Sequence, residues 1–350
     1  MRFLLDAEQR EFTASLNSLL TAADTPSVIR DWSRGDHTRG RALWRRIAEA
    51  GVFALAVPEA YEGLGPRPVE LAVAFVELGR HAVPGPLVET VTAATLLTAL
   101  DDTGPAKRLL TALGSGESAA TLALGPYALD ADMADVRLTL SARPAGGDEA
   151  LRADGGPGTP GCGEKAPTRT RTELRLAPPP GHPPHPSLDP ARRLFPTPRG
   201  GELLATDPPL APAVLIARLT TAAQALGVGL ALLDKTVSYV RQRTQFGAPI
   251  GSFQAVKHQL ADAKTALEFA RPLLFGAALT MTREDVAAAK VTACEAAYRT
   301  ARTALQLHGA IGYTAEYDLS LWLTKARALR TAWGSPDECR ETVLSGGRRW

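Results

Sequence analysis

The sequence predicts an α+β fold that is mostly α, with a small β domain between two helical regions. Apolar residues recur at helical spacing from about residue 6 to 113, and they return to that spacing from 211 onward. Between 121 and 210, two short runs alternate apolar and polar residues, as half-buried strands do. We therefore expect an N-terminal helical domain at 1–120, a shortened, loop-rich middle β domain at 121–210, and a C-terminal four-helix bundle at 211–350.

The first region begins with an amphipathic pattern in which Leu16 and Leu20 share one helical face. It is interrupted at Pro58, at a Gly- and Pro-containing segment at 63–66, and at a Pro-Gly-Pro turn at 84–86. Proline removes a backbone donor and glycine opens other backbone conformations, so helices end at such points. Roughly four helices joined by short turns are expected.

The two alternating runs of the middle region lie at 136–140 and 172–176. In each run, every second residue is leucine, valine or threonine, and the residues between them are polar or charged. This alternation predicts two strands. The interval 145–186 is crowded with glycine and proline. Much of that interval is therefore expected to be loop.

Good helix formers dominate the last region, where long helices are expected. Their expected ranges are 211–243, 253–281, 284–309 and 317–332, followed by a short helix at 337–345. The stretch 220–233 is rich in small apolar residues on all faces, so this part of its helix should be deeply buried. Gly227 and Gly229 within it fit either close helix packing or a widened ligand pocket, and packing is favoured.

Composition narrows the classes of function. The 39 Lys and Arg residues nearly balance the 37 Asp and Glu residues, so no strong field for a nucleic acid is implied. The chain starts without a basic segment before an apolar run, and no run apolar enough for a membrane span is expected, which favours a cytoplasmic protein. Cys162, Cys294 and Cys339 are too scattered for a disulfide framework. His182 and His185 lack further ligands at metal-binding spacing, so no metal site is expected.

Two segments of the last region carry polar and glycine residues in a defined order. The first, R-T-Q-F-G-A-P-I-G-S-F-Q-A-V-K-H, occupies 243–258, and the second, Q-L-H-G-A-I-G-Y-T-A-E, occupies 306–316. Together they resemble the acyl-CoA dehydrogenase family. The segments V-P-E-A-Y-E-G-L-G at 57–65 and S-L-D-P-A-R-R-L at 187–194 are similar to further family segments, although each is also compatible with an ordinary turn.

The resemblance implies that the protein binds FAD. The implied cofactor contacts are Arg243, Gln245, Phe246, Gln254, Gln306, Gly309, Gly312 and Thr314. A guanidinium fork suits a diphosphate, and glycine lets backbone amides approach it closely. Ala310 stands where the family has a second glycine, and its methyl group would crowd the cofactor. Taken alone, Arg243 is also compatible with a solvated charge at a helix end, and Gly309 with an ordinary helix cap.

The same resemblance implies a reaction that needs a proton-accepting glutamate, and this chain lacks one at the family's usual positions. In the family, a glutamate removes the α-proton of an acyl-CoA thioester while the β-hydrogen leaves as hydride to the flavin. At the two positions where family members carry that glutamate, this sequence has Trp333 and Ala217. Neither accepts a proton, since the indole of tryptophan offers only a donor. Arg218, next to Ala217, matches an arginine on the substrate side.

The middle domain is also reduced, because the family's flavin-covering T-E-P-x-x-G-S-D segment is expected near 121–135 and only 122–126 resembles it. Such losses occur in family members that form α₂β₂ complexes. We therefore expect a base-lacking subunit of a dehydrogenase that acts on CH–CH bonds of acyl-CoA. Its partners would be a second dehydrogenase subunit, or its own copies in a dimer or tetramer, and an electron-transfer acceptor. The alternatives are an active dehydrogenase with another base, such as Glu202 or Asp207, and a flavin-free structural or binding protein.

Overall fold

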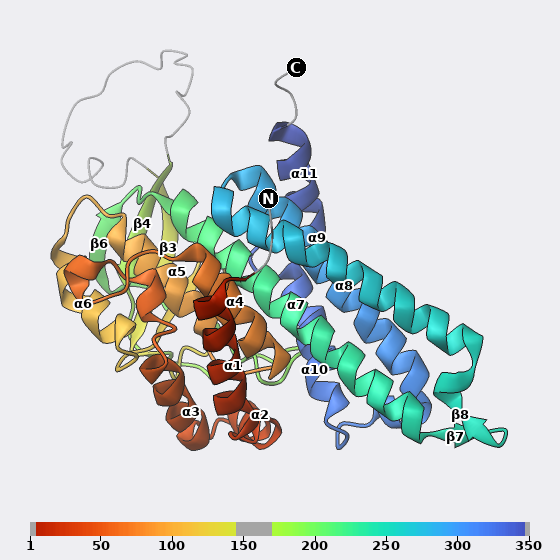
Figure 1. Cartoon of the computed structure of the whole chain (residues 1–350). Helices are drawn as coiled ribbons and strands as arrows, with labels where there is room; N and C mark the ends of the chain where they lie inside the picture. Colours follow the sequence, from red (N-terminus) through yellow and green to blue (C-terminus); the bar gives the residue numbers. More distant parts are fainter. Residues whose placement is uncertain (1–4, 145–169, 347–350) are drawn as a thin grey trace, which may run out of the picture.

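The computed structural model describes residues 5–144 and 170–346. Within the described residues, the N-terminal region contains more helices than expected (Figure 1). Its α-helices are α1 (Ala7–Thr21), α2 (Thr25–Ser33), α3 (Thr38–Glu49), α4 (Pro68–Arg80), α5 (Leu87–Thr98) and α6 (Gly104–Gly114), with short 3₁₀ turns η1 (Ala54–Ala56) and η2 (Glu59–Tyr61). The expectation of about four helices was thus too low, and α2 and α6, with 9 and 11 residues, are the two shortest of these six helices. The expected breaks near Pro58 and at 84–86 do separate helices.

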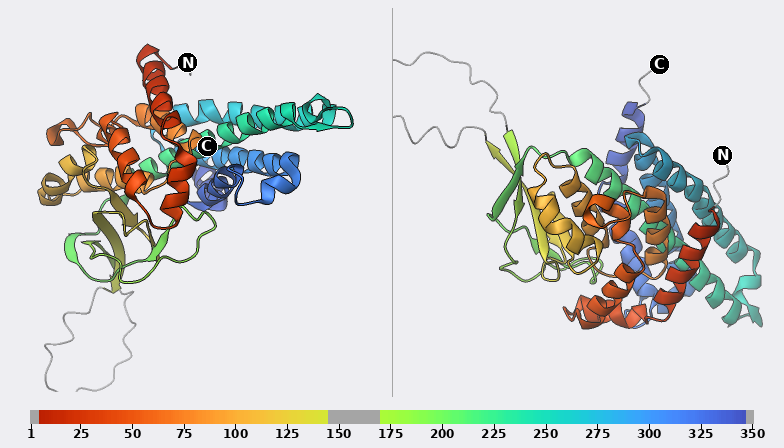
Figure 2. Two further views of the ribbon diagram at one scale, coloured as in Figure 1. Left: turned by 90° about the horizontal axis from the view of Figure 1, so that it is seen from below. Right: turned by 60° about the vertical axis from the view of Figure 1, so that its left-hand side comes forward.

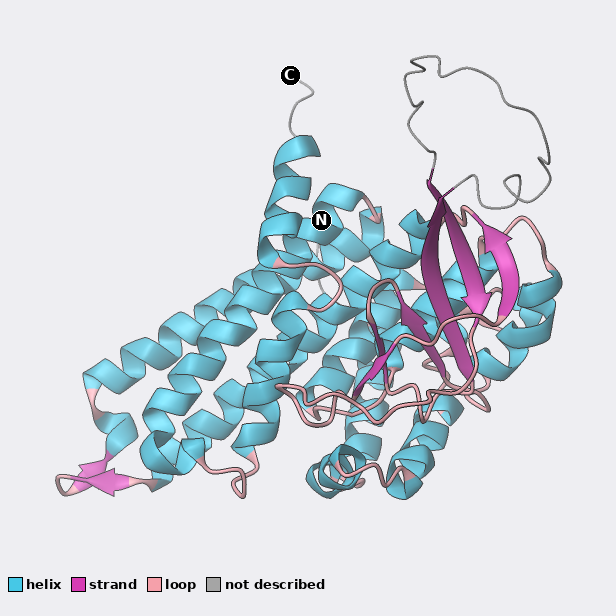
Figure 3. Ribbon diagram, turned by 180° about the vertical axis from the view of Figure 1, so that it is seen from behind, coloured by secondary structure: helices cyan, strands magenta, loops and turns pink. Residues whose placement is uncertain are grey.

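The middle region forms one four-stranded sheet and one two-stranded sheet (Figure 3). The strands are β1 (Ala120–Ala123), β2 (Tyr127–Leu129), β3 (Val136–Pro144), β4 (Thr170–Leu176), β5 (Leu194–Pro196) and β6 (Glu202–Thr206). The larger sheet has the order β1-β3-β4-β6, with β1 and β3 parallel and the other pairs antiparallel. The strands expected at 136–140 and 172–176 are confirmed as its two central strands. Part of the expected loop, 145–169, lies outside the described residues.

The C-terminal helices begin and end within two residues of the expected bounds. They are α7 (Leu210–Gln242), α8 (Gln254–Thr280), α9 (Arg283–His308), α10 (Leu319–Thr331) and α11 (Pro336–Gly346). Between α7 and α8 the chain makes a hairpin of β7 (Thr244–Gln245) and β8 (Ala248–Pro249), followed by η3 (Ile250–Ser252). The four long helices α7 to α10 lie side by side as a bundle, and the N-terminal helices and sheet cover one end of it (Figures 1 and 2). The division into domains at residues 120 and 210 stays a prediction.

The central helix is α7, which packs against α4, α5, α8, α9 and α10. Its side chains from Leu219 to Leu233 are buried, so the expectation for 220–233 is confirmed. A Cβ atom on Gly227 would lie 1.9 Å from the carbonyl oxygen of Val76, and one on Gly229 would lie 2.5 Å from Leu267 Cδ2. Both glycines therefore serve close helix packing, because a side chain at either position would separate α7 from its neighbours.

Helix α7 is both long and apolar. An 18-residue window of this helix has a mean hydropathy of 1.5, so the helix is long and apolar enough to cross a membrane. However, 78% of that window is buried inside the protein, as in the core helix of a soluble protein, so its apolar surface is used for packing.

Gly227→Ala is expected to destabilise the protein because the added methyl group would collide with the α4 backbone. Overpacking of this kind costs about 1–3 kcal/mol in the free energy of unfolding, measured here by urea denaturation. Gly181→Ala is the matched control, since a Cβ atom there meets nothing within 4 Å. Equal stability of the two variants would show that α4 and α7 are not in backbone contact.

Candidate functional site

The first cofactor segment forms the hairpin that projects from one end of the bundle (Figure 1). The Arg243 N–H donates to the Tyr239 carbonyl, and the Arg243 carbonyl accepts from Ile250, which closes the base of the hairpin. At its tip Phe246 has φ +54° and Gly247 has φ +76°, a tight turn in the left-handed region. The predicted cofactor residues of this segment are Arg243, Gln245, Phe246 and Gln254, and all four are exposed.

The second cofactor segment lies at the same end of the bundle, where α9 ends. The His308 ring stacks on Tyr239 at a centroid distance of 4.1 Å, and the Tyr239 hydroxyl donates to the His308 carbonyl at 3.4 Å. Because Tyr239 also anchors Arg243, the structure brings the two segments together. His308 is buried and its Nδ1 lies 2.7 Å from the Ala304 carbonyl, so it has the contacts of a packed histidine.

The glycines and Thr314 of the second segment have different surroundings. Gly309 has φ +61°, and a Cβ atom there would meet nothing within 4 Å, so its backbone faces open space. Gly312 is buried, and a Cβ atom would lie 3.2 Å from both His308 Cβ and Leu305 Cδ1. The Thr314 hydroxyl donates to the Ile311 carbonyl at 2.9 Å. Gly309 is thus open to a ligand, whereas Gly312 and Thr314 shape the turn.

Beside this turn α9 carries a basic groove of about 480 Å³. The groove is lined by Gln259, Arg299, Arg302, Thr303, Leu305, Gln306 and Tyr313. Arg299, Arg302 and Gln306 follow one another at helical i, i+3 and i+7 spacing, which places them on one face. That spacing could have identified the two arginines from the sequence, but the sequence reasoning singled out only Gln306.

The two positions expected to carry a base are linked through Arg218, the residue after Ala217. Ala217 is fully buried on α7, and the Nε–H of the adjacent Arg218 donates to the Trp333 carbonyl at 3.1 Å. Trp333 has φ +59° in the turn between α10 and α11. Its indole N–H donates to Glu89 Oε1 at 3.2 Å, so the turn contacts α5 as well as α7.

Glu89 belongs to a buried cluster of charged groups between the N-terminal helices, the sheet and the bundle. Glu89, Asp130, Asp189 and Lys325 are each at most 5% exposed, and Arg192 lies 3.9 Å from Glu89 Oε1. The Lys325 ammonium donates to the carbonyls of residues 82 and 83. Burial lowers the pKa of Lys325 to about 8, although the negative charge of Asp189 opposes the shift. Sequence reasoning missed most of this cluster, although a single charged residue in the otherwise uncharged α5 is a signal for Glu89.

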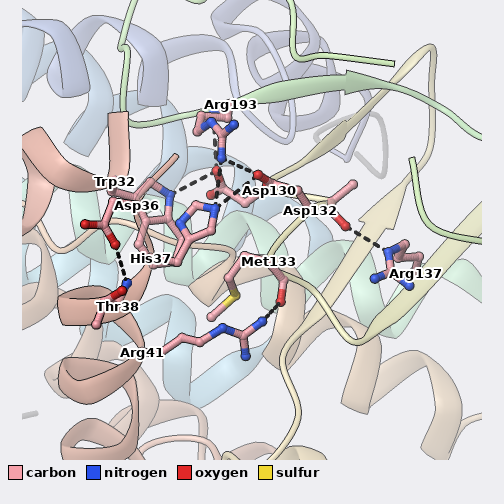
Figure 4. Close-up of polar contacts among 11 residues, drawn as sticks. Trp32, Asp36, His37, Thr38, Arg41, Asp130, Asp132, Met133, Arg137 and Arg193 are labelled. Atoms are coloured by element: carbon pink, nitrogen blue, oxygen red, sulfur yellow. Dashed lines mark hydrogen bonds and ion pairs between the residues drawn. The ribbon is translucent and has the colours of Figure 1, made fainter. Parts of the chain in front are cut away.

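Asp130 connects three segments within this cluster (Figure 4). Its Oδ1 accepts from the Trp32 indole at 3.1 Å and from the Arg193 N–H at 3.3 Å, and its backbone has φ +48°. Its Oδ2 is buried without a hydrogen-bond partner among the described residues. Burial raises the pKa of Asp130 to about 7, against the opposing effects of the Trp32 hydrogen bond and the Arg192 charge.

The two alternative bases lie elsewhere, near the exposed edge of the sheet. Glu202 forms an ion pair with Arg108 at 2.9 Å, and Asp207 accepts from the Thr172 N–H at 2.8 Å. Among the hydrogen bonds and ion pairs of residues 5–144 and 170–346, none joins either carboxylate to Trp333.

Comparison with known proteins decides the family. The model of the acyl-CoA dehydrogenase N-terminal domain matches residues 6–117, and that of the acyl-CoA dehydrogenase C-terminal domain matches residues 213–346. The chain belongs to the acyl-CoA dehydrogenase family. Acyl-CoA dehydrogenase IpdE2 of Mycobacterium tuberculosis is 31% identical over 335 residues, covering 95% of this chain and 94% of that protein.

Solved acyl-CoA dehydrogenases share the fold. The ChsE4–ChsE5 complex from Mycobacterium tuberculosis superposes with a TM-score of 0.81 at 22% identity, covering 100% of both chains. A glutaryl-CoA dehydrogenase from Mycobacterium smegmatis in complex with FADH2 superposes with a TM-score of 0.80 at 15% identity, covering 98% of this chain and 95% of that one. The mostly helical α+β fold expected from the sequence is therefore confirmed.

Acyl-CoA dehydrogenases are FAD-dependent oxidoreductases that act on CH–CH bonds, and the resemblance seen in the sequence is confirmed. The polar groups at the end of this bundle fit the diphosphate half of FAD. The open backbone at Gly309 and the arginines of the α9 groove offer the donors that a diphosphate requires. The individual FAD contacts stay predictions.

Asp130→Asn is expected to weaken the decline of stability with rising pH. Because the folded-state pKa of Asp130 is raised to about 7, its contribution is fully present below the unfolded-state pKa and is lost as pH rises through about 7. The variant lacks this titrating group. Between about pH 5 and pH 8, its free energy of unfolding should therefore decrease less than that of the wild type, by a difference on the order of 2 kcal/mol. Urea denaturation at both pH values measures the difference. Parallel profiles for the two proteins would contradict the assignment.

Proposed function

We propose that this chain is the base-lacking subunit of a heteromeric, FAD-dependent acyl-CoA dehydrogenase. The observation that carries the proposal is the contact between Arg218 and Trp333. It ties one expected base position, Trp333, to the residue that follows the other, Ala217, and the side chains at these two positions are an indole and a methyl group. Neither takes a proton from the α-carbon of a thioester, so a carboxylate of a second chain would do so.

The residues proposed to hold FAD lie in the two segments at the end of the bundle. Arg243 would pair with a phosphate, while Gln245 and Gln254 would donate to polar edges of the cofactor. Gln306 and the open backbone at Gly309 would serve a diphosphate beside the α9 groove. When bound, FAD supplies the hydride acceptor of the reaction, and an electron-transfer protein would reoxidise it.

The partner is proposed to be a second acyl-CoA dehydrogenase chain. Large apolar side chains are exposed on the hairpin, along α8 and on the turn after α9. They are Phe246, Phe253, Phe269, Leu273, Leu279, Ile311 and Tyr313. Exposed apolar groups gathered in this way are typical of an interface. The similar fold of the ChsE4–ChsE5 complex supports a complex built from two different dehydrogenase chains. The alternative is a dimer or tetramer of this chain alone. We place the complex in the cytoplasm.

A second candidate function is an active dehydrogenase with a non-standard base. The buried carboxylate of Glu89 accepts a hydrogen bond from Trp333, so Glu89 is a better candidate for this base than Glu202 or Asp207. A third candidate, a flavin-free scaffold, is opposed by the segment 243–254, whose residue types have little use without the cofactor.

Co-expression with a base-bearing dehydrogenase is expected to yield a yellow complex whose flavin is bleached by acyl-CoA. This chain purified alone is expected to show no such bleaching, because it lacks a proton acceptor at its site. Flavin absorbance after addition of octanoyl-CoA measures the bleaching of the complex and of the chain purified alone. A yellow, active protein made of this chain alone would exclude the proposed function, and absence of flavin even with the partner and added FAD would favour the scaffold.

Arg243→Ala is expected to weaken FAD binding by the complex about tenfold or more, because it removes a charge-assisted hydrogen bond to a phosphate. The measurement is the FAD retained per complex after dialysis. Arg283→Ala is the matched control, since Arg283 is also exposed but begins α9 at the opposite end of the bundle. Equal loss of FAD from both variants would remove Arg243 from the site.

A further inference from the structure

Trp333 is held in place from two sides. Its φ of +59° lies in the left-handed region, which bulky side chains rarely adopt. Arg218 of α7 holds its carbonyl at 3.1 Å, and Glu89 of α5 holds its indole N–H at 3.2 Å. Its ring also packs against the hydrophobic core. An unfavourable backbone conformation persists where the surroundings fix it, and such places are common at functional sites.

Glu89 is an unusual residue for its position. It is 3% exposed in the first turn of α5, where the other residues are apolar or threonine. Its Oε1 receives the Trp333 indole and faces Arg192 at 3.9 Å, while its Oε2 has no hydrogen-bond partner among the described residues. Burying a carboxylate with an unmade hydrogen bond costs stability. The contact that it makes is therefore expected to have a function beyond stability.

We propose that Trp333, held by Glu89, fills the acyl site of this chain and keeps acyl-CoA thioesters out of it. The inference rests on the proposed function, which assigns this position to the reacting end of the substrate. The indole is larger than a glutamate side chain; its N–H is held by α5, and the backbone carbonyl of the same residue is held by α7. The assembled enzyme then binds its substrate only at the site that uses the partner's base.

The number of thioesters bound by the FAD-loaded complex tests this inference. Octanoyl-CoA is titrated into the complex of this chain with a base-bearing partner and followed by calorimetry. The wild-type complex is expected to bind one thioester per pair of chains. Trp333→Ala is expected to bind two, with the added site at least about tenfold tighter than any second site of the wild type. Trp333→Phe keeps most of the ring and is expected to bind one.

Variants of Glu89 test the holding contact separately. Glu89→Ala removes the acceptor and frees the indole, so a second site is expected to appear. Glu89→Gln keeps an acceptor oxygen and is expected to bind one thioester, as the wild type does. Thermal unfolding and FAD content identify variants that are not folded, and if Trp333→Ala is among them, Glu89→Ala carries the test.

Two outcomes would overturn the inference: two thioesters bound per pair of wild-type chains, or only one bound by folded Trp333→Ala and Glu89→Ala complexes. Failure of the proposed function is distinguished by a different measurement. If this chain purified alone reduces its flavin with octanoyl-CoA, the base-lacking assignment fails, and so does the closed acyl site that rests on it. If the chain alone is inactive and the count of thioesters is still two in the wild type, only the closed site fails.

Discussion

Direct contact between the backbones of α4 and α7 fixes the arrangement of the whole molecule. Gly227 permits it, because any side chain there would meet the Val76 carbonyl. With α4 pressed against it, α7 is covered by N-terminal helices on one side and by α8, α9 and α10 on the other. The same helix carries Arg218 near its start and leads into the cofactor hairpin at its end. The geometry of both functional regions is therefore set by how one apolar helix is packed.

The buried charges form a second layer of organisation at the junction of the N-terminal helices, the sheet and the bundle. Asp130 joins Trp32 of α2 to Arg193, and Lys325 of α10 reaches carbonyl groups that follow α4. Removing charges from water is expensive, and such groups seldom add net stability. They do make the relative placement of the elements specific, because each would be left unpaired in another arrangement.

Regular periodicity explains which parts of the fold could be predicted. The long helices were located to within two residues because 3.6-residue spacing accumulates over many turns, whereas α2 and α6 span only 9 and 11 residues, about three turns or fewer. The two segments that carry the family resemblance could be recognised because their residues are contiguous. The contact of Trp333 with Glu89 could not, because it joins residues far apart in the chain through a tertiary arrangement that no local pattern encodes.

The exposed phenylalanine at the tip of the hairpin has a consequence for the life of the protein in the cell. Phe246 is 94% exposed, and Phe253 lies beside it with its ring edge-on at 6.3 Å. If the proposed heteromeric complex forms, a newly made chain that has not met its partner displays this aromatic pair on a projecting loop. Chaperones and proteases recognise such surfaces, so orphan chains of the proposed complex would be removed while assembled ones would persist. Selective turnover of this kind would balance the amounts of the two subunits without matched rates of synthesis.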